Sequence, residues 1–271
     1  LVPSDMELPV YNKEFGGKRP AWEDLTEEQR QKWIEDMATY AAMIEIMDDG
    51  VGHIVDAFRK KGNLENTVFM FLSDNGATLE GGYLGKLMAD LSNTPYRSYK
   101  QWCYQGGTST PFILTFGDAE KNLDKGGFCN QAAHVIDLLP TCMNLASAVY
   151  PSDKFGHSDL PGISLLPALK GDGLKERTLY FEHQSSCAVI SDNWKLVRND
   201  RNSPWELINL TTDPFEQVDL SASYPEKVQS LEHLWNVWAE SHDVFPLEDK
   251  PWHERISFYK KQNSDQSGKD E

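Results

Sequence analysis

An apolar run that ends in two oxygen-bearing side chains and a glycine most constrains what this chain can become. Residues 68–72 read Val-Phe-Met-Phe-Leu, a run typical of a buried strand, and Ser73, Asp74, Asn75 and Gly76 follow directly. A carboxylate beside a side-chain amide supplies hard oxygen donors, which suit Ca²⁺ or Mg²⁺. Ligands in open α/β sheets collect where strands end. We therefore predict that Asp74 and Asn75 bind a divalent cation, although Asp-Asn-Gly is also an ordinary turn signal.

Helical periodicity precedes this strand. Thr26 and Gln29 form a capping-box pattern, so a helix is predicted from about residue 26, with a break before Tyr40 and an end at residues 62–63. The acidic pair at 48–49 then lies on the helix surface and outside any metal site. Apolar residues at three- and four-residue spacing share one helix face: Ile44, Met47, Val51, Ile54, Val55 and Phe58.

The chain divides near residue 172, where Lys-Gly-Asp-Gly at 170–173 separates a helix-and-strand region from a strand-rich one. We expect one domain over 1–172 and a small domain over 173–248. The residues from 249–271 are polar and typical of a disordered tail.

Each region has its own expected elements. In the first, we expect strands at 67–73 and 111–116 and a helix through 132–148. In the second, we expect short strands at 178–183, 187–191, 194–199 and 205–209. A helix should follow them at 225–241. The apolar stripe of that last helix predicts that it covers the strands as one side of a core: Val228, Leu231, Leu234, Trp235 and Trp238.

Composition narrows the classes of protein. The chain has 271 residues, of which 39% are hydrophobic, enough for a sizeable core. With 42 acidic and 26 basic residues, the net charge of -16 argues against nucleic acid or an anionic membrane as the main partner. No apolar run approaches the roughly 20 residues of a membrane helix, and no signal-peptide pattern is visible. The 4 cysteines lack metal-ligand spacing, and they neither demand nor exclude a disulfide.

Ordered segments along nearly the whole chain resemble the sulfatase family of the alkaline-phosphatase-like superfamily, in particular arylsulfatase-type enzymes. The segments lie at 1–9, 40–52, 64–76, 100–111, 134–141, 179–183, 194–197 and 205–210. The resemblance implies an α/β fold: the C-terminal part of an α/β/α sulfatase core, followed by a small antiparallel sheet with one helix. It implies a hydrolase that releases inorganic sulfate from an aryl or carbohydrate sulfate ester. A periplasmic or secreted location follows only by analogy.

The same resemblance implies roles for individual residues. Lys100 matches the lysine that contacts the sulfate group in sulfatases, although a lysine by itself is usually a solvated surface charge. His183, at a predicted strand end, matches the substrate pocket. Asp74 and Asn75 would supply part of a Ca²⁺ shell, with Mg²⁺ as the alternative. Gln105 stands where many relatives carry glutamate before the paired glycines.

The family's nucleophile is a Cys or Ser in a Cys/Ser-x-Pro-x-Arg segment, which is oxidised to formylglycine. No such segment occurs in these 271 residues. Residues 92–97 read Ser-Asn-Thr-Pro-Tyr-Arg. This segment has one residue more between its serine and its proline than the family's pattern allows, and we interpret it as a turn. We therefore expect formylglycine only in sequence outside this chain, and we expect the chain alone to be inactive.

Several alternatives stay open. His134 and Asp137 could pair or bind a metal, but their place at a helix start favours a structural role. A phosphatase or phosphodiesterase of the same superfamily would usually bind two transition metals through further Asp and His residues, and Asn75 beside Asp74 favours one hard cation instead. A third possibility is a non-catalytic remnant or interaction partner.

Overall fold

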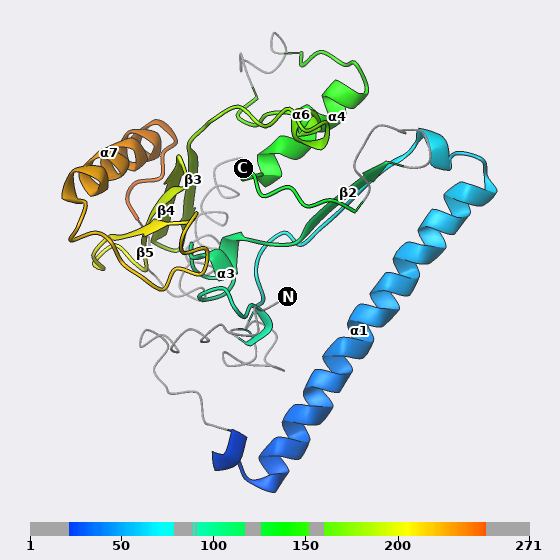
Figure 1. The fold of residues 1–271 in the computed structure, drawn as a ribbon, viewed down its shortest axis with the longest axis horizontal. Coiled ribbons are helices and arrows are strands. Elements are labelled where there is room, and N and C mark those ends of the chain that lie inside the picture. The colour runs from blue at the N-terminus through cyan, green and yellow to red at the C-terminus, as the bar shows by residue number, and fades with distance from the viewer. Residues whose placement is uncertain (1–21, 79–88, 90, 117–125, 152–159, 248–271) are drawn as a thin grey trace, which may run out of the picture. The chain divides into compact units, whose positions relative to one another are not determined.

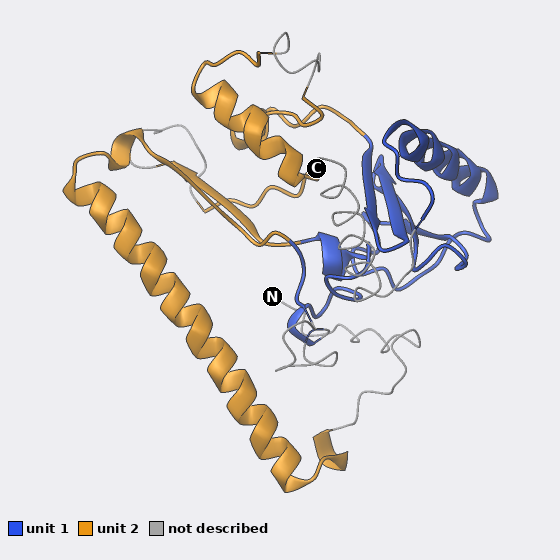
Figure 2. Ribbon diagram, turned by 180° about the vertical axis from the view of Figure 1, so that it is seen from behind, with its two compact units in different colours: residues 1–18, 75–109, 178–271 blue, residues 19–74, 110–177 orange. Residues whose placement is uncertain are grey.

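The computed structural model describes residues 22–78, 89, 91–116, 126–151 and 160–247. The chain forms two compact units, shown in Figure 2: unit 1 comprises residues 1–18, 75–109 and 178–271, and unit 2 comprises residues 19–74 and 110–177. The mixture of helices and antiparallel sheets confirms the predicted α/β class. The predicted domain division at residue 172 stays a prediction, and the predicted polar tail at 249–271 lies outside the described residues.

Unit 2 begins with a short 3₁₀ helix, η2 (Trp22–Asp24), and the long helix α1 (Glu27–Lys60). The predicted capping box is present, because the Thr26 hydroxyl accepts from the Gln29 N–H at 3.2 Å and the Gln29 side chain accepts from the Thr26 N–H at 2.9 Å. The predicted break before Tyr40 is wrong. The hydroxyl of Thr39 donates to the Glu35 carbonyl at 2.8 Å, so this polar side chain is satisfied along the helix and does not interrupt it.

The apolar stripe of α1 is largely exposed among the described residues. The exposed fraction is 48% for Met47 and 54% for Ile54. Phe58 meets Phe69 edge-on, with ring centroids 5.7 Å apart. The acidic pair at 48–49 lies inside the helix, as predicted. Although α1 is long, no helix among the described residues is apolar enough to cross a membrane.

The predicted apolar strand forms β1 (Val68–Leu72), after the 3₁₀ helix η3 (Leu64–Asn66). It pairs antiparallel with β2 (Phe112–Phe116), and Leu72 lies opposite Phe112. The contact continues past the strand, because the Ser73 N–H donates to the Pro111 carbonyl at 3.1 Å. The hydroxyl of Thr110 donates to the Ser73 carbonyl at 2.8 Å. The chain is therefore held firmly up to the residue before Asp74.

The predicted helix at 132–148 is shorter than expected. It consists of the 3₁₀ helix η4 (Val135–Asp137) and α4 (Leu138–Leu145); a further short helix, α6, spans Leu166–Leu169. His134 Nδ1 accepts from the Ile136 N–H at 3.2 Å, and the Asp137 carboxylate accepts from the His134 N–H at 2.8 Å. The same carboxylate pairs with Arg177 at 2.5 Å. These contacts confirm the structural role that we favoured for His134 and Asp137.

Unit 1 contains a four-stranded antiparallel sheet in the order β3-β4-β5-β6. The strands are β3 (Leu179–His183), β4 (Ser186–Ser191), β5 (Trp194–Arg198) and β6 (Glu206–Asn209). Helix α7 (Pro225–Ser241) packs on one face of the sheet (Figure 1). Of its predicted stripe, Leu231 and Trp235 are buried, whereas Leu234 is 36% exposed at the margin.

Trp235 dominates this core. It is completely buried, and its indole N–H donates to the Phe181 carbonyl at 3.1 Å. We expect Trp235→Ala to lower the free energy of unfolding by about 3–5 kcal/mol, because it leaves a large cavity and removes the hydrogen bond to the Phe181 carbonyl. Val237→Ala, on the exposed side of α7, should change it by less than about 0.5 kcal/mol. Urea unfolding followed by circular dichroism measures both, and equal effects would contradict this account.

The Asp137–Arg177 pair predicts a pH dependence. Burial alone would raise the pKa of Asp137, but the Arg177 guanidinium and the N–H groups of Ile163 and His134 outweigh burial and hold that pKa below its usual range. Because the folded-state pKa is lowered, the stabilisation is complete above the unfolded pKa of about 3.9 and is lost as the pH falls through the folded value.

We therefore expect Asp137→Asn to lower the free energy of unfolding by about 3 kcal/mol at pH 7. The difference from wild type should shrink as the pH falls below about 4, because the carboxylate takes up a proton there in the unfolded state, whereas the folded carboxylate does so only at lower pH. Unfolding curves of both proteins at pH 7 and pH 3 test this. A difference that stays constant over this range would show that charge pairing is not the cause.

Candidate active site

The two predicted cation ligands follow β1 directly. Asp74 is exposed and ends a segment of unit 2, and Asn75 is half-buried and opens a segment of unit 1. Both carry the oxygen atoms that a hard cation prefers. Within the described residues, no group of three or more His, Cys, Asp or Glu side chains could hold a metal ion. Asp74 and Asn75 thus fit a Ca²⁺ or Mg²⁺ shell only as two of its six or more ligands.

Backbone hydrogen bonds tie the residues after Asn75 to the segment that carries Lys100. The Gly76 N–H donates to the Gly107 carbonyl at 3.1 Å, and the Lys100 N–H donates to the Ala77 carbonyl at 3.0 Å. These two bonds join residues that are 31 and 23 positions apart in the sequence. Asn75 and Lys100 belong to the same local structure of unit 1.

Glycine is required where these segments meet. A Cβ atom on Gly76 would lie 1.8 Å from the Gly106 carbonyl oxygen, and one on Gly106 would lie 2.0 Å from the Ser98 carbonyl oxygen. A Cβ on Gly107 would lie 1.9 Å from the Trp102 carbonyl oxygen. Real Cβ atoms do not approach backbone this closely, so the contact depends on glycine at all three positions. The paired glycines Gly106 and Gly107 are therefore part of the scaffold.

The turn predicted at 92–97 contains a residue whose importance the sequence did not reveal. The Asn93 side-chain amide donates to the carbonyls of Gly106 at 2.8 Å and Ser98 at 3.1 Å, and its oxygen accepts from the Ala77 N–H at 3.1 Å. One side chain thus links three separate stretches of backbone. An asparagine in a Ser-Asn-Thr-Pro turn gives no sign of such distant partners.

His183 lies at the exposed end of β3. Its Nδ1 atom is 3.2 Å from the carbonyl oxygen of Gln101, the residue after Lys100. The fold therefore places His183 beside the segment of Lys100, as a shared site requires. Its part in substrate binding stays a prediction.

A buried ion pair lies next to the paired glycines, and sequence reasoning missed it. Lys195 Nζ lies 2.7 Å from Glu216 Oε1 and 3.2 Å from Gln105 Oε1. The Lys195 and Glu216 side chains are both completely buried. Burial raises the pKa of Glu216, and the nearby Lys195 ammonium opposes that shift. The available signal was a lysine between Trp194 and Leu196 in a predicted strand, because lysine is rarely buried without a partner.

The buried cysteines are poor nucleophiles. Burial raises the pKa of Cys103 to about 12 and that of Cys187 to about 11. Both thiols therefore stay protonated at neutral pH, whereas the reactive form of cysteine is the thiolate. Neither replaces the nucleophile whose sequence pattern the chain lacks.

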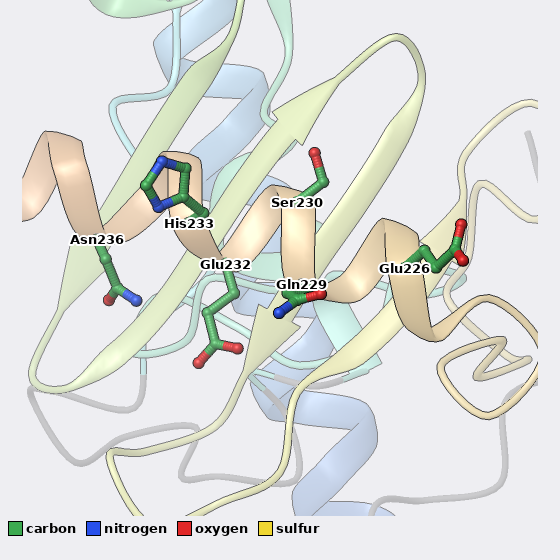
Figure 3. A pocket seen from close by; sticks show the side chains of 6 residues that line it. All are labelled: Glu226, Gln229, Ser230, Glu232, His233 and Asn236. Carbon is green, nitrogen blue, oxygen red and sulfur yellow. The ribbon is translucent and has the colours of Figure 1, made fainter.

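The structure also has an open depression along α7 (Figure 3), lined by Glu226, Gln229, Ser230, Glu232, His233 and Asn236. Glu232 accepts a hydrogen bond from the Trp205 indole at 2.9 Å, so this carboxylate has a structural role. The predicted site residues Asn75, Lys100 and His183 are not among its lining residues. The depression is therefore separate from the candidate active site.

Known proteins are similar to this chain in sequence and in fold. An uncharacterized sulfatase of Schizosaccharomyces pombe is 25% identical over 302 residues, which cover 96% of this chain and 53% of the relative. The dog N-acetylgalactosamine-6-sulfatase is 30% identical over 217 residues, which cover 77% of this chain and 38% of the relative. The chain thus spans about half the length of the first relative and less of the second.

The solved structure of Ps i-CgsB in complex with k-i-k-neocarrahexaose superposes with a TM-score of 0.63 at 25% identity, covering 80% of this chain and 45% of that chain. This likeness, shared with further solved sulfatases, confirms the predicted alkaline-phosphatase-like α/β fold. The sequence model of the Sulfatase family matches residues 6–148, which is more than half of the chain. On this match, the chain belongs to the sulfatase family.

Proposed function

We propose that this protein hydrolyses sulfate esters and releases inorganic sulfate. The observation that carries the proposal is the hydrogen-bonded contact between the residues after Asn75 and the segment of Lys100, with His183 beside that segment. Sulfatase relatives support the class of reaction. Each of these residues has a chemical property that the cleavage of a sulfate ester requires.

Lys100 would act electrostatically. Its ammonium would offset the negative charge on the sulfate oxygens and on the leaving oxygen as the ester bond breaks. Asp74 and Asn75 would supply oxygen ligands to Ca²⁺, or to Mg²⁺ in its place. When bound, such a cation withdraws charge from sulfate oxygens and favours the ionised form of a nucleophile. His183 would contact the substrate near the bond that is cleaved.

The nucleophile has to come from residues outside these 271, since the Cys/Ser-x-Pro-x-Arg pattern is absent from them. We propose that it is a formylglycine, by analogy with the family. The chain by itself would then bind the cation through too few ligands and would lack the attacking group. It would have no activity alone.

A sulfated carbohydrate is the substrate class that we propose first. One relative is named for a sulfated amino sugar, and the solved neighbour is described in complex with an oligosaccharide. An aryl sulfate is the alternative and the convenient assay compound. An interaction role remains the second candidate, because the apolar stripe of α1 is exposed among the described residues.

The test is sulfatase activity with a chromogenic aryl sulfate and a sulfated oligosaccharide, for the 271-residue chain and for the complete product of its gene. We expect activity only in the complete product, abolished by a Ca²⁺ chelator and restored by Ca²⁺. Lys100→Ala and Asp74→Ala should each lower kcat by about 10²–10³-fold, because the first removes a positive charge that stabilises the transition state and the second removes a ligand of the cation.

Lys175→Ala and Asp172→Ala are the matched controls, since both residues are exposed and neither is a predicted ligand. They should leave kcat within about twofold of wild type. Activity in the 271-residue chain alone would refute the assignment of the nucleophile to other residues. No activity in the complete product would favour the interaction role.

A further inference from the structure

The small sheet of unit 1 has two different faces. Leu196 of β5 and Leu207 of β6 point toward α7 and share a core with Leu231 and Trp235. Side chains alternate along a strand, so the neighbours of these leucines face the other way. On that opposite face, Val197 and Ile208 pack with Cys103 and Tyr104, which belong to the segment of Lys100.

That segment, residues 97–105, is bound to the sheet along its length. The contacts are Arg97 with Glu206 at 2.6 Å, the Gln101 carbonyl with His183 at 3.2 Å, the Cys103 N–H with the Ser186 hydroxyl at 2.9 Å, the Tyr104 hydroxyl with Glu206 at 2.5 Å, and the Gln105 N–H with Glu216 at 2.7 Å. The Arg97 guanidinium also lies 4.0 Å from the centre of the Tyr104 ring. Lys100 therefore lies in a segment fixed on both sides.

At the end of this segment, the buried pair Lys195–Glu216 binds both the backbone N–H and the side-chain oxygen of Gln105. Glu216 Oε2 accepts the Gln105 N–H at 2.7 Å, and Lys195 Nζ donates to the Gln105 side-chain oxygen at 3.2 Å. Taking both charges out of water has a desolvation penalty that their attraction often only balances. A net gain in stability therefore does not explain the pair well, whereas fixing the position of Gln105 does.

A fixed Gln105 controls the backbone around it. It begins the single turn α3 (Gln105–Thr108), and the next residue, Gly106, donates its N–H to the Arg97 carbonyl at 2.8 Å. Gly107 accepts from the Gly76 N–H. The glycine contacts leave no free space, so a displacement of Gln105 would displace Gly76 and the backbone next to Lys100 as well.

We propose that Lys195 and Glu216 are positioning residues, which hold Lys100 and the residues after Asn75 in place through Gln105. The assignment to sulfate-ester cleavage rests on the function proposed above, whereas the effect on the segment does not. The pair acts on the reaction only through these other residues.

Two double variants separate positioning from charge. Both Lys195→Met/Glu216→Met and Lys195→Met/Glu216→Gln remove the ion pair without leaving a lone buried charge. Only the second keeps an acceptor for the Gln105 N–H. Leu196→Met/Leu207→Met is the matched control, because both leucines are completely buried, lie on β5 and β6, and face α7.

The first measurement is amide hydrogen exchange of the 271-residue chain, which needs no catalytic activity. We expect exchange at Lys100, Gly106 and Gly107 to be at least about tenfold faster in the Met/Met variant than in wild type. The Met/Gln variant should restore most of the protection, and the leucine control should leave these amides unchanged. If the Met/Met variant does not fold, Gln105→Met, which removes only the bond to Lys195, takes its place, and it should raise exchange at the same three amides by a smaller factor while leaving the rest of the sheet unchanged.

The second measurement is kinetics in the complete gene product. The Met/Met variant should lower kcat by about tenfold or more with little change in KM, because misplaced charge matters most in the transition state, and the Met/Gln variant should recover kcat. Unchanged exchange at the three amides, or an equal loss of protection throughout the sheet, would overturn the proposal. If the wild-type product is inactive, the proposed function fails, and the exchange result still decides whether the pair positions the segment.

Discussion

Close contact between backbone segments that are far apart in the sequence is the constraint on which unit 1 depends. Gly76, Gly106 and Gly107 let carbonyl groups approach to distances that any side chain would prevent. Hydrogen bonds from Gly76 and Lys100 then join the two segments, and the Asn93 amide bridges them. Since each group depends on the position of the next, the arrangement is either formed as a whole or not formed.

The small antiparallel sheet has two tasks because its two faces differ. Toward α7 it presents a mainly apolar core around Trp235, which stabilises the unit, with the Arg198 guanidinium 5.5 Å from the centre of the Trp235 ring. Toward the segment 97–105 it presents apolar side chains together with Lys195, Ser186 and the nearby Glu216, which bind particular backbone groups. Apolar packing is not directional, whereas hydrogen bonds and ion pairs fix position. This difference explains why buried polar groups gather on the face toward Lys100.

Much of the local structure could be predicted from the sequence. The capping box at Thr26, the strand at 68–72 and the helix at 225–241 follow from patterns of neighbouring residues, and the structure confirms them. The break before Tyr40 was wrong, since a polar threonine was satisfied within the helix by the carbonyl of the preceding turn. The helix predicted at 132–148 was too long. The capping contacts of His134 and Asp137 place its first residue later in the chain than its apolar residues suggested.

The sequence by itself determined the sulfatase family, and it singled out Asp74 and Asn75 as candidate cation ligands and Lys100 and His183 as candidate substrate contacts, because each of these depends on residue type and order along the chain. Only the tertiary structure decided what holds these residues. Gly106 lies 13 positions from its partner Asn93, and the partners that join Arg97 to Glu206, and Gln105 to Lys195 and Glu216, lie 90 to 111 positions apart. Contacts of this kind depend on strand register and on the space between packed segments, and no local pattern in the sequence specifies either.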